Sequence, residues 1–338
     1  MSLAPLRRRR IVVLPDVYTD AVCEMPPWPE ASRRLGAIAA RGGGNLPVGP
    51  IRIKAGGNAA NLALALAHLG AQVDLIAATD AMGRDLVARA AAGTRLNLER
   101  VRVGPTGSAT LALECGGANV MLSHPGPLSA FGPARLEAED WQRIEAADAV
   151  AVVNWAQNQQ GTELLAAVAR RVGADSFLYF DSGDPRHRGA EARQLVRPTA
   201  WWPRVGAFGM NRNELEAFTG RTLEEDDLVT AAQGLAARLG TRIDFHCRLW
   251  AASITADTVA RTKAFASRGR RATGAGDAWN AGNLAGQLLG WDARERLRLA
   301  HRVATLYVTG SDGMPPDAAA VVKPVRRPAS ENVLLVPP

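Results

Sequence analysis

Short apolar segments alternate with amphipathic segments along most of the chain. The apolar segments predict buried strands, which lie at residues 11–14, 73–77, 149–153, 177–180 and 243–245. Between them, apolar residues recur at helical spacing and a glycine follows the last one, a pattern typical of amphipathic helices. We expect these helices at residues 58–69, 162–172, 214–218 and 223–239, and a further one that begins near residue 275. The alternation predicts an α/β fold with a doubly wound, mostly parallel sheet and helices on both faces.

Two segments depart from this alternation. Residues 21–50 are rich in proline and glycine, and we expect them to be irregular or to form an excursion at the edge of the sheet. Residues 106–115 alternate between apolar and polar positions, and no helix pattern follows them. They predict a hairpin or a small sheet outside the main layer.

Length and composition fit one domain over residues 1–338 and narrow the choice of partners. Hydrophobic residues make up 47% of the chain, and no apolar run approaches the ~20 residues that span a bilayer. The arginines near the start precede no long apolar stretch, and the 3 cysteines lack metal-binding spacing, so we expect a cytoplasmic protein with reduced thiols. The net charge of +7 comes mostly from scattered arginines without a nucleic-acid-binding module, which favours small anionic ligands over nucleic acid.

The most informative motif is TGAGDAWNAG at residues 273–282, where small residues precede an aspartate at the expected start of a helix. The first backbone N–H groups of a helix have no partner within it and attract anions, and Gly274, Ala275 and Gly276 leave that backbone open to a close approach. Asp277 stands in the same turn. Phosphoryl transfer needs both parts: donors for the charge on the moving group and a carboxylate for the acceptor's proton. The local sequence alone is explained about as well if Asp277 only caps the N-terminus of its own helix.

A second motif, KAGGNAAN at residues 54–61, combines two glycines with two side-chain amides. Gly56 and Gly57 let the chain pass close to a ligand. Asn58 and Asn61 both donate and accept hydrogen bonds, which suits ligands with several hydroxyl groups. Taken in isolation, the pattern favours a glycine turn with Asn58 as the N-cap of the next helix.

A third motif is NRNE at residues 211–214. Asn211 and Glu214 are three residues apart and share one face of a helix start. An amide and a carboxylate in that arrangement would hold the water shell of Mg²⁺, which prefers oxygen ligands and retains water. A capping box explains the same spacing equally well.

These three motifs, in this order and at these separations, resemble the ribokinase-like (PfkB) carbohydrate kinase family over nearly the whole chain. Residues 56–61 resemble its N-terminal signature, residues 273–277 its more specific C-terminal signature, and residues 211–214 its N-x-x-E magnesium motif. Asp20 is placed like the family's substrate-binding aspartate, and residues 181–186 are similar to its D-P-N-x-R stretch.

The resemblance implies a role for each of the matching residues. Asp277 would be the catalytic base, beside an anion hole formed by the amides of Gly274, Ala275 and Gly276. The acceptor would be bound by residues of the first strand's end and of the second motif, namely Asp20, Gly56, Gly57, Asn58 and Asn61. ATP is the expected co-substrate, with contacts from Asn211, Thr273, Gly276 and His301. Asn211 and Glu214 would hold Mg²⁺ at the phosphates.

The resemblance also implies a ribokinase-like fold with a small β lid over the acceptor. Segments 21–53 and 101–121 are the lid candidates, and in many relatives the lid also forms a homodimer. One departure concerns residues 246–252, where the family has a T-x-G-x-x-G-like turn beside the nucleotide and this chain has no glycine. Leu249 and Trp250 would crowd a close approach of the backbone there unless they pack on the base.

Three functions therefore stay open at this point. The first is ATP-dependent phosphorylation of a hydroxyl group of a sugar or sugar-like small molecule. The second is a nucleoside kinase of the same fold, in which Trp28, Trp155 or Trp250 would stack on a base. The third is a non-catalytic sugar-binding or regulatory relative, and the missing glycine turn motivates it.

Overall fold

The main sheet is nine-stranded and mostly parallel in the computed structural model, which describes residues 2–116, 118–265, 273–311 and 313–323. Only the two strands at one edge, β14 and β15, are antiparallel to their neighbours. In the order in which they lie side by side, the strands are β15 (Val259–Lys263), β14 (Trp250–Ile254), β13 (Arg242–His246), β12 (Val205–Met210), β11 (Phe177–Asp181), β10 (Ala149–Val152), β1 (Arg10–Leu14), β4 (Gln72–Leu75) and β6 (Leu96–Asn97).

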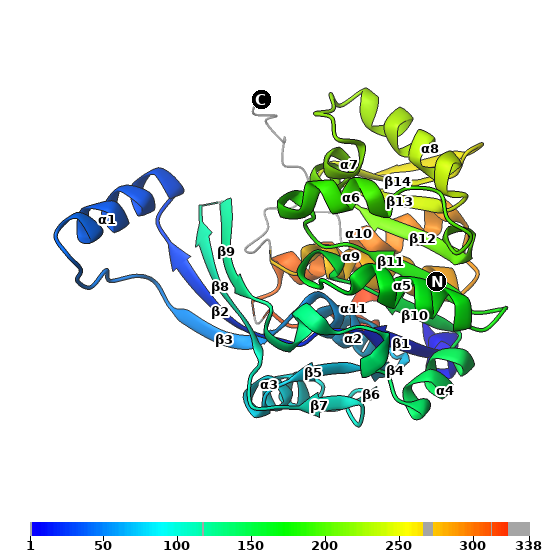
Figure 1. Cartoon of the computed structure of the whole chain (residues 1–338), viewed down its shortest axis with the longest axis horizontal. Helices are drawn as coiled ribbons and strands as arrows, with labels where there is room; N and C mark the ends of the chain where they lie inside the picture. Colours follow the sequence, from blue (N-terminus) through cyan, green and yellow to red (C-terminus); the bar gives the residue numbers. More distant parts are fainter. Residues whose placement is uncertain (1, 117, 266–272, 312, 324–338) are drawn as a thin grey trace.

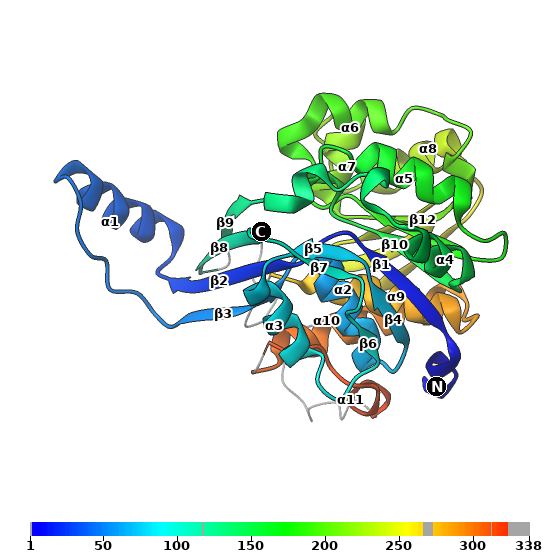
Figure 2. The ribbon, with the colours of Figure 1, turned by 60° about the horizontal axis from the view of Figure 1, so that its bottom comes forward.

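Helices cover both faces of this sheet, so the predicted doubly wound α/β fold is confirmed (Figures 1 and 2). One face is covered by α4 (Ala138–Ala146), α5 (Gly161–Arg171), α6 (Gly189–Leu195), α7 (Arg212–Thr219) and α8 (Asp227–Leu239). The other face is covered by α2 (Asn58–His68), α3 (Ala81–Ala90), α9 (Ala275–Leu288), α10 (Ala293–Thr309) and α11 (Ala318–Val322). Of the helices in the described part of the chain, none has the length and apolar content needed to cross a membrane.

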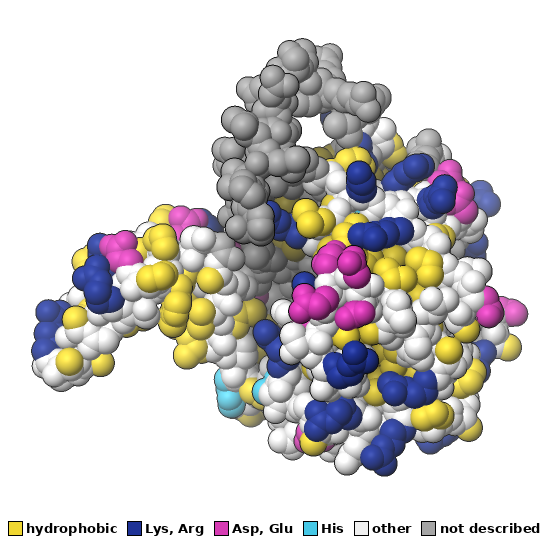
Figure 3. All heavy atoms as spheres, turned by 90° about the horizontal axis from the view of Figure 1, so that it is seen from above, with side chains coloured by type: hydrophobic (Ala, Val, Ile, Leu, Met, Phe, Trp, Pro, Cys, Tyr) yellow, Lys and Arg dark blue, Asp and Glu magenta, His cyan; other side chains and the backbone are white. Residues whose placement is uncertain are grey.

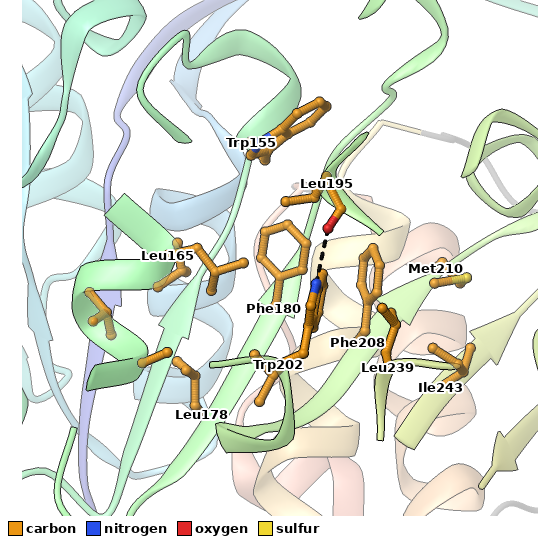
Figure 4. Packing of buried hydrophobic residues seen from close by; sticks show 14 of the residues in the cluster. Trp155, Leu165, Leu178, Phe180, Leu195, Trp202, Phe208, Met210, Leu239 and Ile243 are labelled. Carbon is orange, nitrogen blue, oxygen red and sulfur yellow. Dashed lines mark hydrogen bonds between the residues drawn. The ribbon is translucent and has the colours of Figure 1, made fainter. Parts of the chain in front are cut away.

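The central strands are apolar over most of their length, apart from Arg10 at the start of β1 and Asp181 at the end of β11, because helices bury them on both sides. On the face of α4–α8, an aromatic group fills the space between sheet and helices (Figure 4). The rings of Phe180 and Phe208 lie 4.7 Å apart and those of Trp202 and Phe208 lie 5.6 Å apart, while the indole of Trp202 donates a hydrogen bond to the carbonyl of Leu195. Each large aromatic ring contributes roughly 1.5–3 kcal/mol of hydrophobic stabilisation when fully buried.

A second, four-stranded sheet extends from the main body as an arm (Figure 1). Its order is β3 (Ile51–Gly56), β2 (Tyr18–Met25), β8 (Ser108–Cys115) and β9 (Ala118–His124). The pairing of β8 with β9 confirms the hairpin predicted from residues 106–115. A short sheet of β5 (Ala77–Thr79) and β7 (Val101–Val103) lies beside α3.

The expectation that residues 21–50 are irregular is wrong for much of that segment. Strand β2 continues to Met25, and α1 (Trp28–Ala40) follows it at the far end of the arm. Pro27 and Pro29 stand at the N-cap and in the first turn of α1, where a missing N–H group costs no helical hydrogen bond. These prolines therefore mark the start of a helix rather than a loop.

The parallel strands bring residues from distant parts of the sequence to one edge of the main sheet. Polar residues stand at or directly after the carboxyl ends of five neighbouring strands: Asp16 after β1, Asn154 after β10, Asp181 at the end of β11, Asn211 after β12 and His246 at the end of β13. Ligands of open parallel sheets bind at this edge. The arm and the first turn of α9 lie at the same end of the molecule (Figure 1).

Candidate active site

The first turn of α9 places Asp277 beside open backbone donors. Gly274 is the N-cap residue and has a left-handed conformation with φ of 84°, and no side chain caps the helix. A Cβ atom at Gly274 would lie 2.6 Å from the hydroxyl oxygen of Tyr307, so the turn requires glycine for its conformation and for space. The first backbone N–H groups of α9 are thus available to an anion next to Asp277.

The side chain of Asp277 bonds to α2 rather than to its own helix. The amide of Asn58 donates to Oδ1 of Asp277 at 3.1 Å, and the amide of Asn61 donates to Oδ2 at 2.9 Å. Asp277 is 8% exposed. The two alternative explanations from the sequence are therefore wrong: Asp277 does not cap α9, and Asn58 is the first residue of α2 after an N-cap at Gly57.

Burial raises the pKa of Asp277 well above its usual range. The hydrogen bond from Asn61 and the charge of Lys54 act in the opposite direction, and the nearby carboxylates of Asp181 and Asp16 raise the pKa further. Removal of a carboxylate from water disfavours its charged form, so the ionised Asp277 has a stronger affinity for a proton than an exposed aspartate has. This is the property that a general base requires.

Asp20 and the two glycines of the second motif lie close together at the base of the arm. Asp20 is on β2 and 2% exposed, and burial raises its pKa to about 6 while the charge of Lys54 lowers it. A Cβ atom at Gly56 would lie 2.0 Å from Oδ2 of Asp20. Gly57 has φ of 92°, and a Cβ atom there would lie 2.4 Å from Oδ2 of Asp16. Both glycines are thus required by the aspartates that pack against them.

Asp16 and Asn154 were missed in the sequence, although each stands two residues after a buried strand at the ligand edge of the sheet. Oδ1 of Asp16 accepts the backbone N–H of Ala59 at 3.0 Å, and Oδ2 accepts the amide of Asn154 at 3.1 Å. Asp16 is fully buried, and burial raises its pKa to about 6. Asp16 therefore anchors the first turn of α2, the helix whose amides bind Asp277.

A third aspartate, Asp181, lies close enough to Asp277 to raise its pKa. Its Oδ1 accepts the backbone N–H of Gly183 and its Oδ2 accepts the amide of Asn280, each at 2.8 Å. Asn280 is one helical turn after Asp277 and also accepts the hydroxyl of Tyr179 at 2.6 Å. Burial raises the pKa of Asp181. The sequence pointed to residues 181–186 but gave no reason to connect them with Asn280.

Asn211 and Glu214 form the capping box that the sequence allowed as an alternative. The side chain of Glu214 accepts the backbone N–H of Asn211 at 2.8 Å, and the side chain of Asn211 accepts the backbone N–H of Glu214 at 3.2 Å. Glu214 is 6% exposed, and burial together with the nearby Asp181 raises its pKa well above its usual range. The pair thus has a structural role at the start of α7.

The same surroundings fit a hydrated divalent cation. The charge of Asp181 raises the pKa values of Glu214 and Asp277, and the charge of Asp277 raises that of Glu214 as well, so a positive charge near these carboxylates would relieve their repulsion. Within the described residues, no group of three or more Asp, Glu, His or Cys side chains is arranged to hold a metal ion directly. This combination suits Mg²⁺, which keeps several of its waters and uses few protein ligands.

The remaining nucleotide candidates lie on two sides of the α9 turn. The hydroxyl of Thr273 accepts the amide of Asn119 at 2.8 Å, and the backbone carbonyl of Thr273 accepts the hydroxyl of Tyr307. His301 is on α10 and only 4% exposed, and it packs edge-on against Trp279. The side chain of His301 thus lies inside the protein, behind Trp279.

The turn after β13 is less crowded than the sequence implied. Trp250 is buried in the hydrophobic core, where its ring lies 4.8 Å from that of Phe245 and its indole N–H bonds Glu225. Arg248 and Leu249 are the exposed residues of the turn. The expectation that Trp250 would crowd a ligand or pack on a base is wrong, because Trp250 belongs to the inward-facing side of β14. Trp155 is likewise buried and cannot stack on a base.

The buried carboxylate of Asp277 thus lies beside a helix N-terminus at the ligand edge of a doubly wound sheet. The family model described as "pfkB family carbohydrate kinase" matches residues 31–318. The chain therefore belongs to the pfkB family of carbohydrate kinases, as the three motifs predicted.

Solved structures show the same fold. Ribokinase from Arabidopsis thaliana, in complex with ribose and ATP, is 19% identical and has a TM-score of 0.71, with 93% of this chain and 97% of that chain covered. Ribokinase from Cryptococcus neoformans var. grubii serotype A, in complex with ADP, is 18% identical with a TM-score of 0.71, covering 93% and 98%. A nucleoside kinase from Burkholderia thailandensis, in complex with inosine, is 18% identical with a TM-score of 0.65, covering 92% and 95%. No curated protein matches the sequence.

Proposed function

We propose that this chain transfers the terminal phosphoryl group of ATP to a hydroxyl group of a sugar or sugar-like small molecule, with Asp277 as the base. The observation that carries the proposal is the pair of hydrogen bonds that joins Asn58 and Asn61 to Asp277 across more than 200 residues of sequence. These bonds hold residues 58–61 against the carboxylate in the first turn of α9, which supports the roles proposed for the two segments on the acceptor and donor sides of the transfer. A helix cap alone would not need them.

The chemistry follows from this placement. As the acceptor oxygen bonds to the terminal phosphorus of ATP, its proton passes to the carboxylate of Asp277. The bond from that phosphorus to the bridging oxygen breaks, and ADP leaves with the electron pair. The backbone N–H groups of Gly274, Ala275 and Gly276 stabilise the negative charge on the moving group. Bound Mg²⁺ would neutralise charge on the phosphates, and Asn211 and Glu214 are the residues proposed to hold it through water.

The acceptor would lie between the arm and the main body. Asp20 on β2, with Gly56 and Gly57 at the end of β3, forms the arm side of this space, and Asn58 and Asn61 form its floor. Buried carboxylates and amides accept and donate the hydrogen bonds that a polyol offers. Asp277 is the carboxylate that would meet the hydroxyl to be phosphorylated.

A nucleoside is the second candidate acceptor, since a nucleoside kinase in complex with inosine shares the fold. The degree of burial of the three tryptophans that could stack on a base helps to decide between a sugar and a nucleoside. Trp155 and Trp250 are buried, and Trp28, which is 40% exposed, is the remaining candidate of the three for stacking on a base. A panel of sugars and nucleosides, assayed for ADP release with ATP and Mg²⁺, distinguishes the two acceptors.

The decisive test of the proposed function is the Asp277→Asn variant. We expect the turnover number to fall by about 10²- to 10⁴-fold, the usual worth of a general base, with little change in acceptor binding. Asp292→Asn is the matched control, because Asp292 is an exposed N-cap of α10 and asparagine caps equally well. Full activity in Asp277→Asn would disprove the mechanism. ATP binding without turnover of any acceptor would favour the non-catalytic relative.

The outer face of the arm supports a homodimer. Strand pairing places Ile53, Leu111 and Leu122 in one row across the sheet, and they are 46%, 42% and 56% exposed. Ile51, 58% exposed, continues this face on β3, and Figure 3 shows hydrophobic side chains on the arm. An exposed apolar sheet face of this kind favours association. We expect a dimer in analytical ultracentrifugation and a monomer for Leu111→Glu.

A further inference from the structure

The turn after β13 places an imidazole against the anion-binding backbone of α9. His246 is the last residue of β13, and only three residues separate it from β14. The Cε1 atom of His246 would be 3.7 Å from a Cβ atom on Gly276, which is ordinary van der Waals contact. The ring of His246 also lies 4.7 Å from that of Trp279 on α9. These two contacts fix the imidazole next to the first turn of α9.

The ring nitrogens of His246 take part in no hydrogen bond within the described part of the chain, in contrast to those of His68 and His187, which bond backbone carbonyls. The neighbouring Trp279 and His301 each have a buried ring nitrogen that is also unpartnered in this part of the structure. Burial, with the nearby His301, lowers the pKa of His246 to about 4. At neutral pH the ring is therefore uncharged and carries one N–H donor.

A phosphate held at the α9 turn would lie within reach of this donor. An anion bound by the amides of Gly274–Gly276 would lie against the backbone of this turn, and, outside α9 and its N-cap, His246 is the one described residue within 4 Å of the Cβ position of Gly276. A hydrogen bond from a neutral donor to a charged acceptor in a partly buried site contributes more than one between two neutral groups. The turn itself, Cys247–Arg248–Leu249, contains no glycine that would let the backbone take this role.

We infer that His246 donates a hydrogen bond to a phosphate oxygen of the phosphoryl donor and so determines the affinity of this chain for triphosphates. The inference rests on the proposed function for the position of the donor. It assigns His246 a binding role that depends on its N–H group, whereas a packing role against Trp279 would depend only on its shape.

Two substitutions separate these roles. His246→Leu keeps an apolar body of similar size and removes the donor, and His246→Gln retains an N–H group at a similar reach. We expect the KM for ATP to rise about tenfold in His246→Leu and at most about threefold in His246→Gln, with the KM for the acceptor unchanged in both. Val259→Ala, at an exposed position of the edge strand β15, is the control and should leave both constants unchanged.

The dissociation constant of ATP, measured by calorimetry without acceptor, gives a readout that does not depend on turnover. A tenfold loss of affinity in His246→Leu with recovery in His246→Gln supports the inference even if no acceptor is found. Equal affinities for the wild type and His246→Leu overturn it, as does an equal loss in both variants, which would indicate packing. If His246→Leu does not fold, His246→Ala is compared with His246→Gln by the same criteria. Loss of activity in the wild type with every acceptor would count against the proposed function alone.

Discussion

The amide of Asn61 donates a hydrogen bond of 2.9 Å to Oδ2 of Asp277, and this bond favours the charged form of the carboxylate. Burial acts in the opposite direction and raises the pKa of Asp277 well above its usual range. The balance between the two determines the pH at which Asp277 is ionised and can accept a proton.

We therefore predict that Asn61→Leu raises the pKa of Asp277 further, because the stabilising donor is lost. A base acts in its ionised form, so the acid limb of the profile of kcat/KM against pH moves to higher pH in the variant. At a pH on that limb, activity falls about tenfold or more, the worth of a hydrogen bond to a charged group. Asn119→Ala removes an amide bound to Thr273 and should leave the position of the limb unchanged. An unshifted limb in Asn61→Leu would contradict the assignment of Asp277 as the base.

The capping box and the proposed magnesium role of Glu214 are separable by one substitution. Glutamine forms a capping box as glutamate does, so Glu214→Gln should keep the start of α7 and the melting temperature while it removes the charge. We predict that the Mg²⁺ concentration for half-maximal activity rises about 10- to 100-fold, as for other residues that orient the shell of a metal. Chelation of Mg²⁺ should abolish turnover of the wild type.

Glu216→Gln is the control for this experiment. Glu216 lies on the same helix and pairs with Arg212, away from the carboxylates of the site. If Glu214→Gln and Glu216→Gln showed the same magnesium dependence, the capping box alone would account for the NRNE motif.

Gly56 is predicted to tolerate no side chain, because a Cβ atom would lie 2.0 Å from Oδ2 of the buried Asp20. We expect Gly56→Ala to lower the free energy of unfolding by about 1–3 kcal/mol, the usual cost of overpacking. Asp20 must move, so the KM for the acceptor should also rise. Gly36→Ala on α1 has open space at its Cβ and should be neutral or stabilise by up to about 1 kcal/mol. Denaturant titration measures both variants.

The buried Asp20 predicts a pH dependence of stability. Its pKa of about 6 in the folded protein lies above the value of 3.8 that an unperturbed aspartate has. The folded state then binds a proton more tightly than the unfolded state, so this group's contribution is complete below about pH 4 and is lost as the pH rises through about 6. The free energy of unfolding of Asp20→Asn, relative to that of the wild type, should therefore increase by about 2 kcal/mol between pH 4 and pH 7. A constant difference over this range would show that Asp20 is not perturbed.

The fold and the centre of the site were predictable from the sequence, because both depend on local signals. Apolar runs bounded by glycine gave the strand and helix order, and the small residues before Asp277 marked the start of α9. Asp16 and Asn154 were not predicted, since their only signal is a position after a buried strand, and the sequence does not reveal which strands are neighbours. Helix α1 was missed because proline at a helix start and proline in a loop look alike in the sequence.

The amide of Asn119 on β9 donates a hydrogen bond to Thr273, the residue before the first turn of α9. This bond restricts how the substrate preference of the protein can change in evolution. The hairpin of β8 and β9 pairs with β2, which carries Asp20, and also holds the residue before the first turn of α9. Under the proposed function, an exchange of residues in this hairpin that adapts the protein to a new acceptor would therefore also alter its use of the nucleotide. Selection for a different substrate must then balance two affinities at once.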